Sequence, residues 1–102
     1  MNECIWIYYA RPRPHWYGLE EAAKKDRLAS WSAVADGSKQ AGGIFLGRYH
    51  VRGQHDFETV EIWRFADAEA AFQHWANLSA AGYGEFNAFA NNIGLGTEAP
   101  QP

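Results

Sequence analysis

The sequence contains little of what secreted, disulfide-stabilised or membrane-spanning proteins need. It has one cysteine, Cys4, so an internal disulfide is excluded and a reducing compartment is favoured. No run approaches the roughly 18 apolar residues that a membrane-spanning helix requires. No positive region precedes the apolar run near the N-terminus, as a secretory signal would need. These features predict a cytoplasmic protein without a membrane partner.

An excess of positive charge is also missing. The 9 lysines and arginines are outnumbered by 12 acidic residues, which gives a net charge of −3 and argues against a nucleic-acid partner. The sequence has no glycine-rich phosphate loop, nucleophile elbow or paired-cysteine zinc motif. His50, His55 and Asp56 lie near one turn without the spacing of a known metal site, so we expect no metal.

Aromatic side chains, in contrast, are abundant. Five tryptophans, five tyrosines and six phenylalanines make up 16% of the 102 residues. A chain of this length forms one domain with a modest core. The aromatic residues either fill that core or line a pocket or a dimer interface, where such residues are enriched. Both interpretations remain open on composition alone.

The pattern of apolar and turn residues predicts a ferredoxin-like β-α-β-β-α-β order in the α+β class. Strands are predicted at residues 4–10, 44–52, 57–65 and 85–93, and helices at residues 18–36 and 68–79, the second capped by Asp67. This order gives a four-stranded antiparallel sheet with two helices on one face. We expect residues 1–94 to form the domain and residues 95–102 to be a flexible tail.

The other face of such a sheet is bare. The strands carry enough apolar side chains that an exposed face is disfavoured, and a second copy of the chain is the simplest cover. The sequence therefore predicts a homodimer through the sheet faces. Trp63 is expected in the interior between the sheet and the partner, with Trp6 or Tyr8 nearby.

Ionisable side chains concentrate in the predicted hairpin at residues 47–65. With a four-residue turn, Arg48 lies opposite Glu61 and His50 opposite Thr59 on one face. A five-residue turn reverses the faces and places Tyr49 there instead, because a one-residue shift of register turns over every side chain. In the first register His50 is the candidate general base, oriented by Glu61 or Arg48. The plainer interpretation is a cross-strand ion pair beside an exposed histidine.

Further residues are candidates for holding a small molecule. Aromatic side chains on the strands suit an apolar body, strand amides bind carbonyl groups, and an arginine framed by prolines suits a carboxylate. The predicted catalytic residues are thus His50, Glu61, Arg48 and Tyr49, and the predicted substrate-binding residues are Trp63, Trp6, Tyr8, Asn87, Phe89 and Arg11.

The pattern Gly47-x-Tyr49-x-Val51-x-Gly53 leading to Trp63 is similar to a hairpin of chlorite dismutase-like proteins. Together with Asp67-x-Glu69-Ala70 after that tryptophan, it resembles the dimeric α+β barrel superfamily. The resemblance implies a homodimer with a pocket between sheet and helices. Members include cofactor-free monooxygenases, isomerases, polyketide cyclases and haem-degrading enzymes, so the fold implies no particular reaction.

The resemblance also raises the question of haem. In haem-binding members a helical histidine is the axial ligand, a role for which His74 is the candidate here, although the partner motif is missing. A lone helical histidine is more often a surface or edge residue. We therefore expect no cofactor, with haem as the alternative.

Two classes of function follow. The first is a small-molecule-binding, cofactor-independent enzyme of monooxygenase, isomerase, cyclase or lyase type, which transfers protons on an aromatic or polyketide-like substrate. The second is a ligand-binding or structural dimer without turnover. A buried histidine–carboxylate contact in a pocket favours the first class, and an exposed His50 with a filled barrel favours the second.

Overall fold

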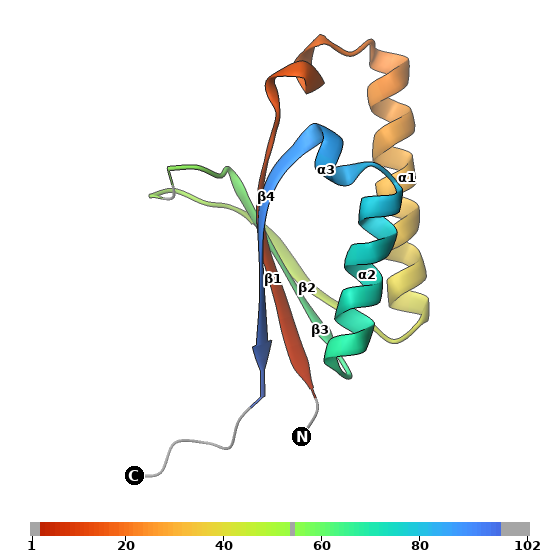
Figure 1. Ribbon diagram of the computed structural model, residues 1–102, viewed down its shortest axis with the longest axis vertical. Helices are drawn as coiled ribbons and strands as arrows, with labels where there is room; N and C mark the ends of the chain where they lie inside the picture. Colours follow the sequence, from red (N-terminus) through yellow and green to blue (C-terminus); the bar gives the residue numbers. More distant parts are fainter. Residues whose placement is uncertain (1–2, 54, 97–102) are drawn as a thin grey trace.

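The computed structural model describes residues 3–53 and 55–96, which form one antiparallel sheet covered on one face by helices (Figure 1). The strands are β1 (Cys4–Pro12), β2 (Ile44–His50), β3 (Thr59–Phe65) and β4 (Asn87–Leu95), in the spatial order β2-β3-β1-β4. The helices are η1 (Pro14–Gly18), α1 (Glu21–Gln40), α2 (Ala68–Ala80) and the short α3 (Tyr83–Phe86).

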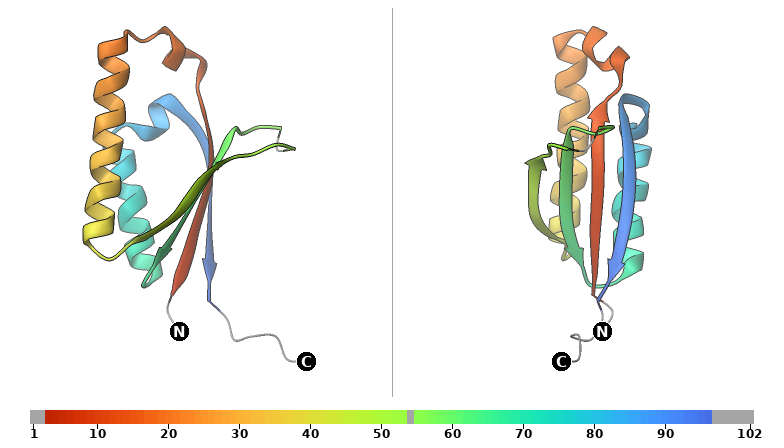
Figure 2. Two further views of the ribbon diagram at one scale, coloured as in Figure 1. Left: turned by 180° about the vertical axis from the view of Figure 1, so that it is seen from behind. Right: turned by 90° about the vertical axis from the view of Figure 1, so that its left-hand side faces the viewer.

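The two views of Figure 2 show the helices on one side of the sheet, and no helix or strand of residues 3–53 and 55–96 covers the other side. This arrangement, with its strand order, confirms the α+β, ferredoxin-like fold predicted from the sequence. None of the helices in residues 3–53 and 55–96 is long and apolar enough to cross a membrane.

The alternation of buried and half-buried side chains along β1 shows where the core lies. Cys4, Trp6 and Tyr8 are at most 3% exposed and face the helices. Ile5 and Ile7, which point to the other face, are only half-buried. Within one chain, therefore, only the helix-covered face of β1 is fully enclosed.

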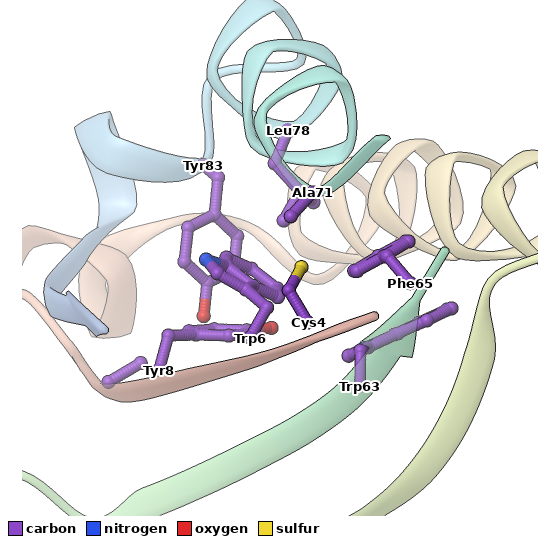
Figure 3. Packing of buried hydrophobic residues seen from close by; sticks show 9 residues of the cluster. Cys4, Trp6, Tyr8, Trp63, Phe65, Ala71, Leu78 and Tyr83 are labelled. Carbon is purple, nitrogen blue, oxygen red and sulfur yellow. The ribbon is translucent and has the colours of Figure 1, made fainter. Parts of the chain in front are cut away.

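Figure 3 shows how aromatic side chains of β1 and β3 meet under α2. Trp6 lies opposite Trp63, and Cys4 lies opposite Phe65. Trp63 is 0% exposed, so the predicted burial of its side chain is correct, whereas the predicted place between the sheet and a partner is not. Its direction differs from the prediction, because it faces the helices and not the uncovered side of the sheet.

The hairpin has the first of the two registers considered, with Arg48 opposite Glu61 and His50 opposite Thr59. Both strands are shorter than predicted, and the connection between them is correspondingly longer. A bulge also interrupts β2 between Phe45 and Gly47. It brings Phe45 and Arg48 to the same face of the sheet although they are three residues apart.

Gly47 permits the bulge. Its φ of 147° lies in a region that residues with a side chain rarely adopt. A Cβ atom there would also approach the Tyr49 hydroxyl oxygen to 2.7 Å. The bulge that brings Phe45 and Arg48 to the same face of the sheet therefore depends on a glycine at position 47.

The second helix begins as predicted, because Asp67 Oδ1 accepts a hydrogen bond from the Ala70 backbone N–H at 2.9 Å. The first helix starts later and extends further than predicted, to Gln40. Helix α3 occupies residues predicted to begin the last strand, so β4 runs from Asn87 to Leu95. The predicted tail at 95–102 lies outside the described residues from position 97 onward.

Candidate functional site

A cavity of about 270 Å³ lies between α1, α2 and the helix-covered face of the sheet. Its walls are mainly aromatic and aliphatic, with a small number of charged and hydroxyl groups, which is the usual character of a small-molecule site. The lining residues are Tyr8, Leu28, Trp31, Ser32, Ala35, Lys39, Phe45, Arg48, Glu61, Trp63, His74, Leu78 and Tyr83.

Helix α1 presents its apolar face to this cavity. Leu28, Trp31, Ala35 and Lys39 recur every three or four residues, which places them on one face of the helix, and all four line the cavity. No residue of α1 is buried. Figure 2 shows α1 and α2 side by side on the helix-covered face of the sheet, and Trp31, Val34 and Ala35 of α1 pack against the core from there.

Trp31 fixes α1 at one side of the cavity. Its Nε1–H donates to the backbone oxygen of Ala81, just beyond the end of α2, at 3.0 Å. Its ring meets the Tyr83 ring edge to face, with centroids 5.1 Å apart. These two contacts hold the helix in place while the rest of its apolar face remains available to the cavity.

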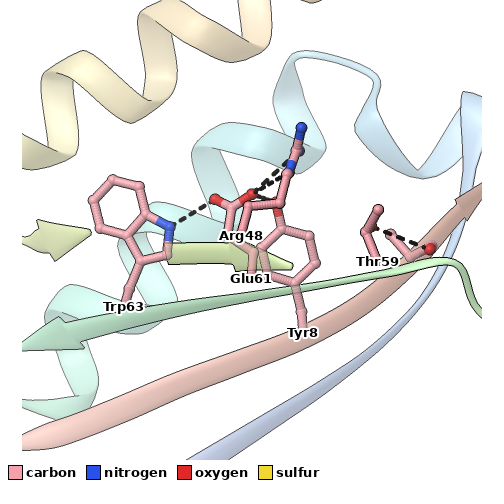
Figure 4. A network of polar contacts seen from close by, with 6 residues as sticks. Tyr8, Arg48, Thr59, Glu61 and Trp63 are labelled. Atoms are coloured by element: carbon pink, nitrogen blue, oxygen red, sulfur yellow. Dashed lines mark hydrogen bonds and ion pairs between the residues drawn. The ribbon is translucent and has the colours of Figure 1, made fainter. Parts of the chain in front are cut away.

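Glu61 is the polar centre of the site (Figure 4). Its Oε2 accepts a hydrogen bond from the Tyr8 hydroxyl at 2.9 Å and from Arg48 Nε at 3.2 Å. Its Oε1 accepts one bond, from Trp63 Nε1 at 2.7 Å. Only 9% of Glu61 is exposed, and these donors supply what a carboxylate needs when it is removed from water.

The four members of this network come from three strands. Tyr8 belongs to β1, Arg48 to β2, and Glu61 and Trp63 to β3. Register brings them together, because Tyr8 and Arg48 lie directly opposite Glu61 on its two neighbouring strands. The site is therefore fixed by the sheet itself and does not depend on a loop.

Two tyrosine hydroxyls at the cavity stay protonated. Burial raises the pKa of Tyr83 to about 12. Burial, reinforced by neighbouring Tyr83 and Glu61, also raises the pKa of Tyr8 well above its ordinary value. Both groups are therefore hydrogen-bond donors at neutral pH.

His74 lies on α2 between the rings of Trp6, Trp63 and Phe65, with centroids 4.8, 4.6 and 5.5 Å away. It is 2% exposed, which corrects the expectation of a surface or edge residue. Its Nδ1 is hydrogen-bonded to Ser38 Oγ, while Nε2 is buried without a partner among the described residues. Burial lowers its pKa to about 4, so the imidazole is neutral at pH 7.

The structure brings together four of the predicted site residues. Arg48, Glu61, Tyr8 and Trp63 line the cavity. Trp6 belongs to the core behind them. Arg11 and Asn87 line an adjoining cavity of about 170 Å³, which shares Leu28, Trp31, Arg48 and Tyr83 with the first.

The remaining candidates lie away from this cavity. His50 is exposed near the end of β2, opposite Thr59. Tyr49 is 55% exposed and points to the uncovered face of the sheet. Phe89 packs against Trp75 with centroids 4.4 Å apart. Among described residues, no group of three or more histidine, cysteine or carboxylate side chains is arranged to hold a metal ion.

Sequence reasoning missed several lining residues. Lys39 continues the face formed by Leu28, Trp31 and Ala35, so extending the predicted helix by one turn would have found it. Phe45 reaches the site because of the bulge in β2, and the only sign of that bulge in the sequence is Gly47. The burial of His74 depends on three aromatic rings from two strands, which no local pattern indicates.

Replacing Glu61 by glutamine tests the network. Glutamine has one carbonyl oxygen in place of two carboxylate oxygens, so Tyr8 or Trp63 loses its acceptor. We expect the free energy of unfolding to fall by about 1–2 kcal/mol, the cost of an unsatisfied buried donor. Urea denaturation measures it, with the exposed Glu58→Gln as the matched control. Equal stabilities of the two variants would contradict the network.

No family model matches the sequence, and no curated protein matches it. Among solved structures, a heme-binding protein from Thermus thermophilus is similar, with a TM-score of 0.75 and 13% identity over 92% of this chain and 40% of that one. A mutant chlorite dismutase from Candidatus Nitrospira defluvii has a TM-score of 0.71 and 14% identity over 97% of this chain and 41% of that one.

The cofactor-independent oxygenase SnoaB from Streptomyces nogalater is similar over its full length. Its TM-score is 0.56 at 10% identity, over 99% of this chain and 100% of that one. The chain thus spans 40% and 41% of the heme-binding and chlorite dismutase chains but all of this oxygenase. At these identities the likeness is one of fold, and it confirms the predicted resemblance to chlorite dismutase-like and related ferredoxin-like α+β proteins.

Proposed function

We propose that the protein binds a small, largely aromatic molecule in the cavity under α1. The observation that carries this proposal is the cavity of about 270 Å³ that the apolar face of α1 lines together with the helix-covered face of the sheet. An amphipathic helix owes most of its stability to what its apolar face contacts. A flat aromatic ligand beside Trp31 and Phe45, which both line the cavity, supplies such contacts.

Proton transfer is the chemistry that the cavity supports best, and we assign it to Glu61. Each carboxylate oxygen accepts two hydrogen bonds, so Oε1, which holds only Trp63 Nε1, retains a position for a substrate proton. Arg48 forms an ion pair with the other oxygen, Oε2. The Tyr83 hydroxyl supplies a donor for an oxygen that gains negative charge, as when a proton leaves the carbon beside a carbonyl.

His50 has no part in this assignment, because it is exposed and does not line the cavity. The cofactor-independent oxygenase with the same fold supports the reaction class of a cofactor-free enzyme. A binding protein without turnover is the alternative, and it uses the same cavity.

The haem-binding relatives in fold raise the question whether His74 fits a haem. A haem needs an open plane beside the imidazole nitrogen that binds iron. Here Nε2 is buried, and the rings of Trp6, Trp63 and Phe65 pack around the imidazole. The cavity, at about 270 Å³, is also below the roughly 300–1,000 Å³ of pockets for drug-sized ligands. These residues do not fit a haem.

Ligand binding is tested by titrating the protein with naphthalenemethanol, a neutral aromatic probe, and following tryptophan fluorescence. Trp31 and Trp63 line the cavity, so we expect a saturable change. Ala35→Phe fills the space from α1 and should weaken binding by about tenfold or more. Ala33→Phe, the same change two residues away on an exposed position, should bind as the wild type does. Equal binding by both variants would place the probe elsewhere.

We also propose that a second copy covers the uncovered sheet face. Its central positions, Ile5, Ile7, Tyr9 and Ile62, are apolar and only half-buried within one chain. Light scattering should therefore give twice the 11.5 kDa mass of one chain. Ile7→Glu should give a folded monomer, whereas Phe72→Glu on the outer side of α2 should not. A wild-type monomer at micromolar concentration would rule out the dimer.

A further inference from the structure

We propose that the ligand of this cavity is a monoanion, an aromatic molecule with one carboxylate, held by Lys39 and Arg48 at the mouth. This inference rests on the proposed function and adds the charge of the molecule that binds. It follows from the inventory of charged groups on the cavity wall. Arg48 and Lys39 are positive and Glu61 is negative, which leaves one positive charge in excess.

Lys39 is the cation without a partner. It lies in the last turn of α1, and no carboxylate of the described residues is within 4.0 Å of its ammonium group. Its Nζ lies 5.4 Å from the centre of the Phe45 ring. This cation–π contact keeps the ammonium group beside Phe45, another residue of the cavity wall, and leaves its charge uncompensated.

Arg48 has hydrogen-bond donors to spare. Its Nε and one terminal nitrogen both contact Glu61 Oε2, at 3.2 Å. A guanidinium group has five N–H donors in a planar fork, so several remain for an acceptor outside the network. The Arg48 side chain is 58% exposed and lines the cavity, so its free donors are accessible to a ligand.

The rest of the wall determines the class of anion. His74 is neutral at pH 7 and adds no charge. Trp31 and Phe45 supply aromatic surface for the body of the ligand. A single carboxylate neutralises the excess charge, whereas a dianion such as a phosphate ester leaves the cavity with an unpaired negative charge. The cavity thus matches a ring system that carries one carboxylate.

The test compares two probes of nearly equal shape, naphthoate and naphthalenemethanol, by tryptophan fluorescence at low salt. Hydrogen bonds to charged groups are the stronger ones, so we expect naphthoate to bind about tenfold tighter or more. Lys39→Met keeps the aliphatic stem and removes the charge. It should remove most of the preference for naphthoate, measured as the ratio of the two affinities within each variant. Lys25→Met, on the exposed side of the same helix, should leave both affinities unchanged.

The outcomes separate the two proposals. If the alcohol binds as tightly as naphthoate, or if Lys39→Met keeps the preference, the anion inference is wrong and the binding site stands. If neither probe binds, the proposed function fails as well. If naphthoate binds equally well to the cavity-filling Ala35→Phe variant, the anion binds outside the cavity and the inference is overturned.

Discussion

Replacement of Trp63 by alanine is expected to lower the free energy of unfolding by about 3–5 kcal/mol, as large aromatic truncations in cores do. The side chain is 0% exposed. Its ring stacks on Phe65 with centroids 5.6 Å apart and an interplanar angle of 5°. It also contacts His74 and donates its N–H to Glu61. Alanine leaves a void among these groups and removes one donor from a buried carboxylate.

Urea denaturation followed by circular dichroism measures this loss. Trp63→Phe helps to separate the two causes, because it keeps a six-membered ring in the core and removes the hydrogen bond to Glu61. It should cost less than alanine. Phe72→Ala, at a position 61% exposed on α2, is the control and should change stability by no more than about 0.5 kcal/mol. A loss below about 1 kcal/mol for Trp63→Ala would contradict the enclosed position.

The elements that the sequence predicted well are those with strong local causes. The apolar run of β1 and the capping Asp67 of α2 each define a start without help from the rest of the chain. The hairpin register remained open between two choices. Tertiary structure selects the one that places Arg48 beside Glu61 and keeps the carboxylate paired.

The parts that could not be predicted depend on distant groups. Helix α1 continues through Gly37, a residue expected to end it, and so brings Lys39 to the cavity. The bulge before Gly47 adds Phe45 to the wall. His50 and Arg48 both face the helices, yet only Arg48 reaches the cavity, because His50 lies beyond it near the strand end. The alternation of side chains along a strand predicts which face of the sheet a residue occupies. Its position along the strand determines whether it reaches the cavity.

The buried His74 predicts a dependence of stability on pH. Its pKa is lowered from 6.5 to about 4 by burial, an effect that Glu61 only partly offsets. In the unfolded chain the imidazole takes up a proton near its ordinary pKa, whereas the folded protein resists it. The unfolded state therefore binds more protons between these two values, and stability falls as the pH falls.

The contribution of the neutral His74 to the free energy of unfolding is fully present above pH 6.5 and is lost as the pH drops to about 4. At about 1.4 kcal/mol per pKa unit, the loss comes to about 3 kcal/mol. Carboxylates titrate at the lower end of this range, so the comparison is with His74→Gln and His74→Phe, which bind no proton at this position. Urea denaturation at pH 7, 5.5 and 4 should show wild-type stability falling more steeply than that of either variant. Parallel pH profiles for all three proteins would show that His74 takes up a proton as readily in the folded protein as in the unfolded chain. That result would contradict the enclosure of His74 by the rings of β1 and β3.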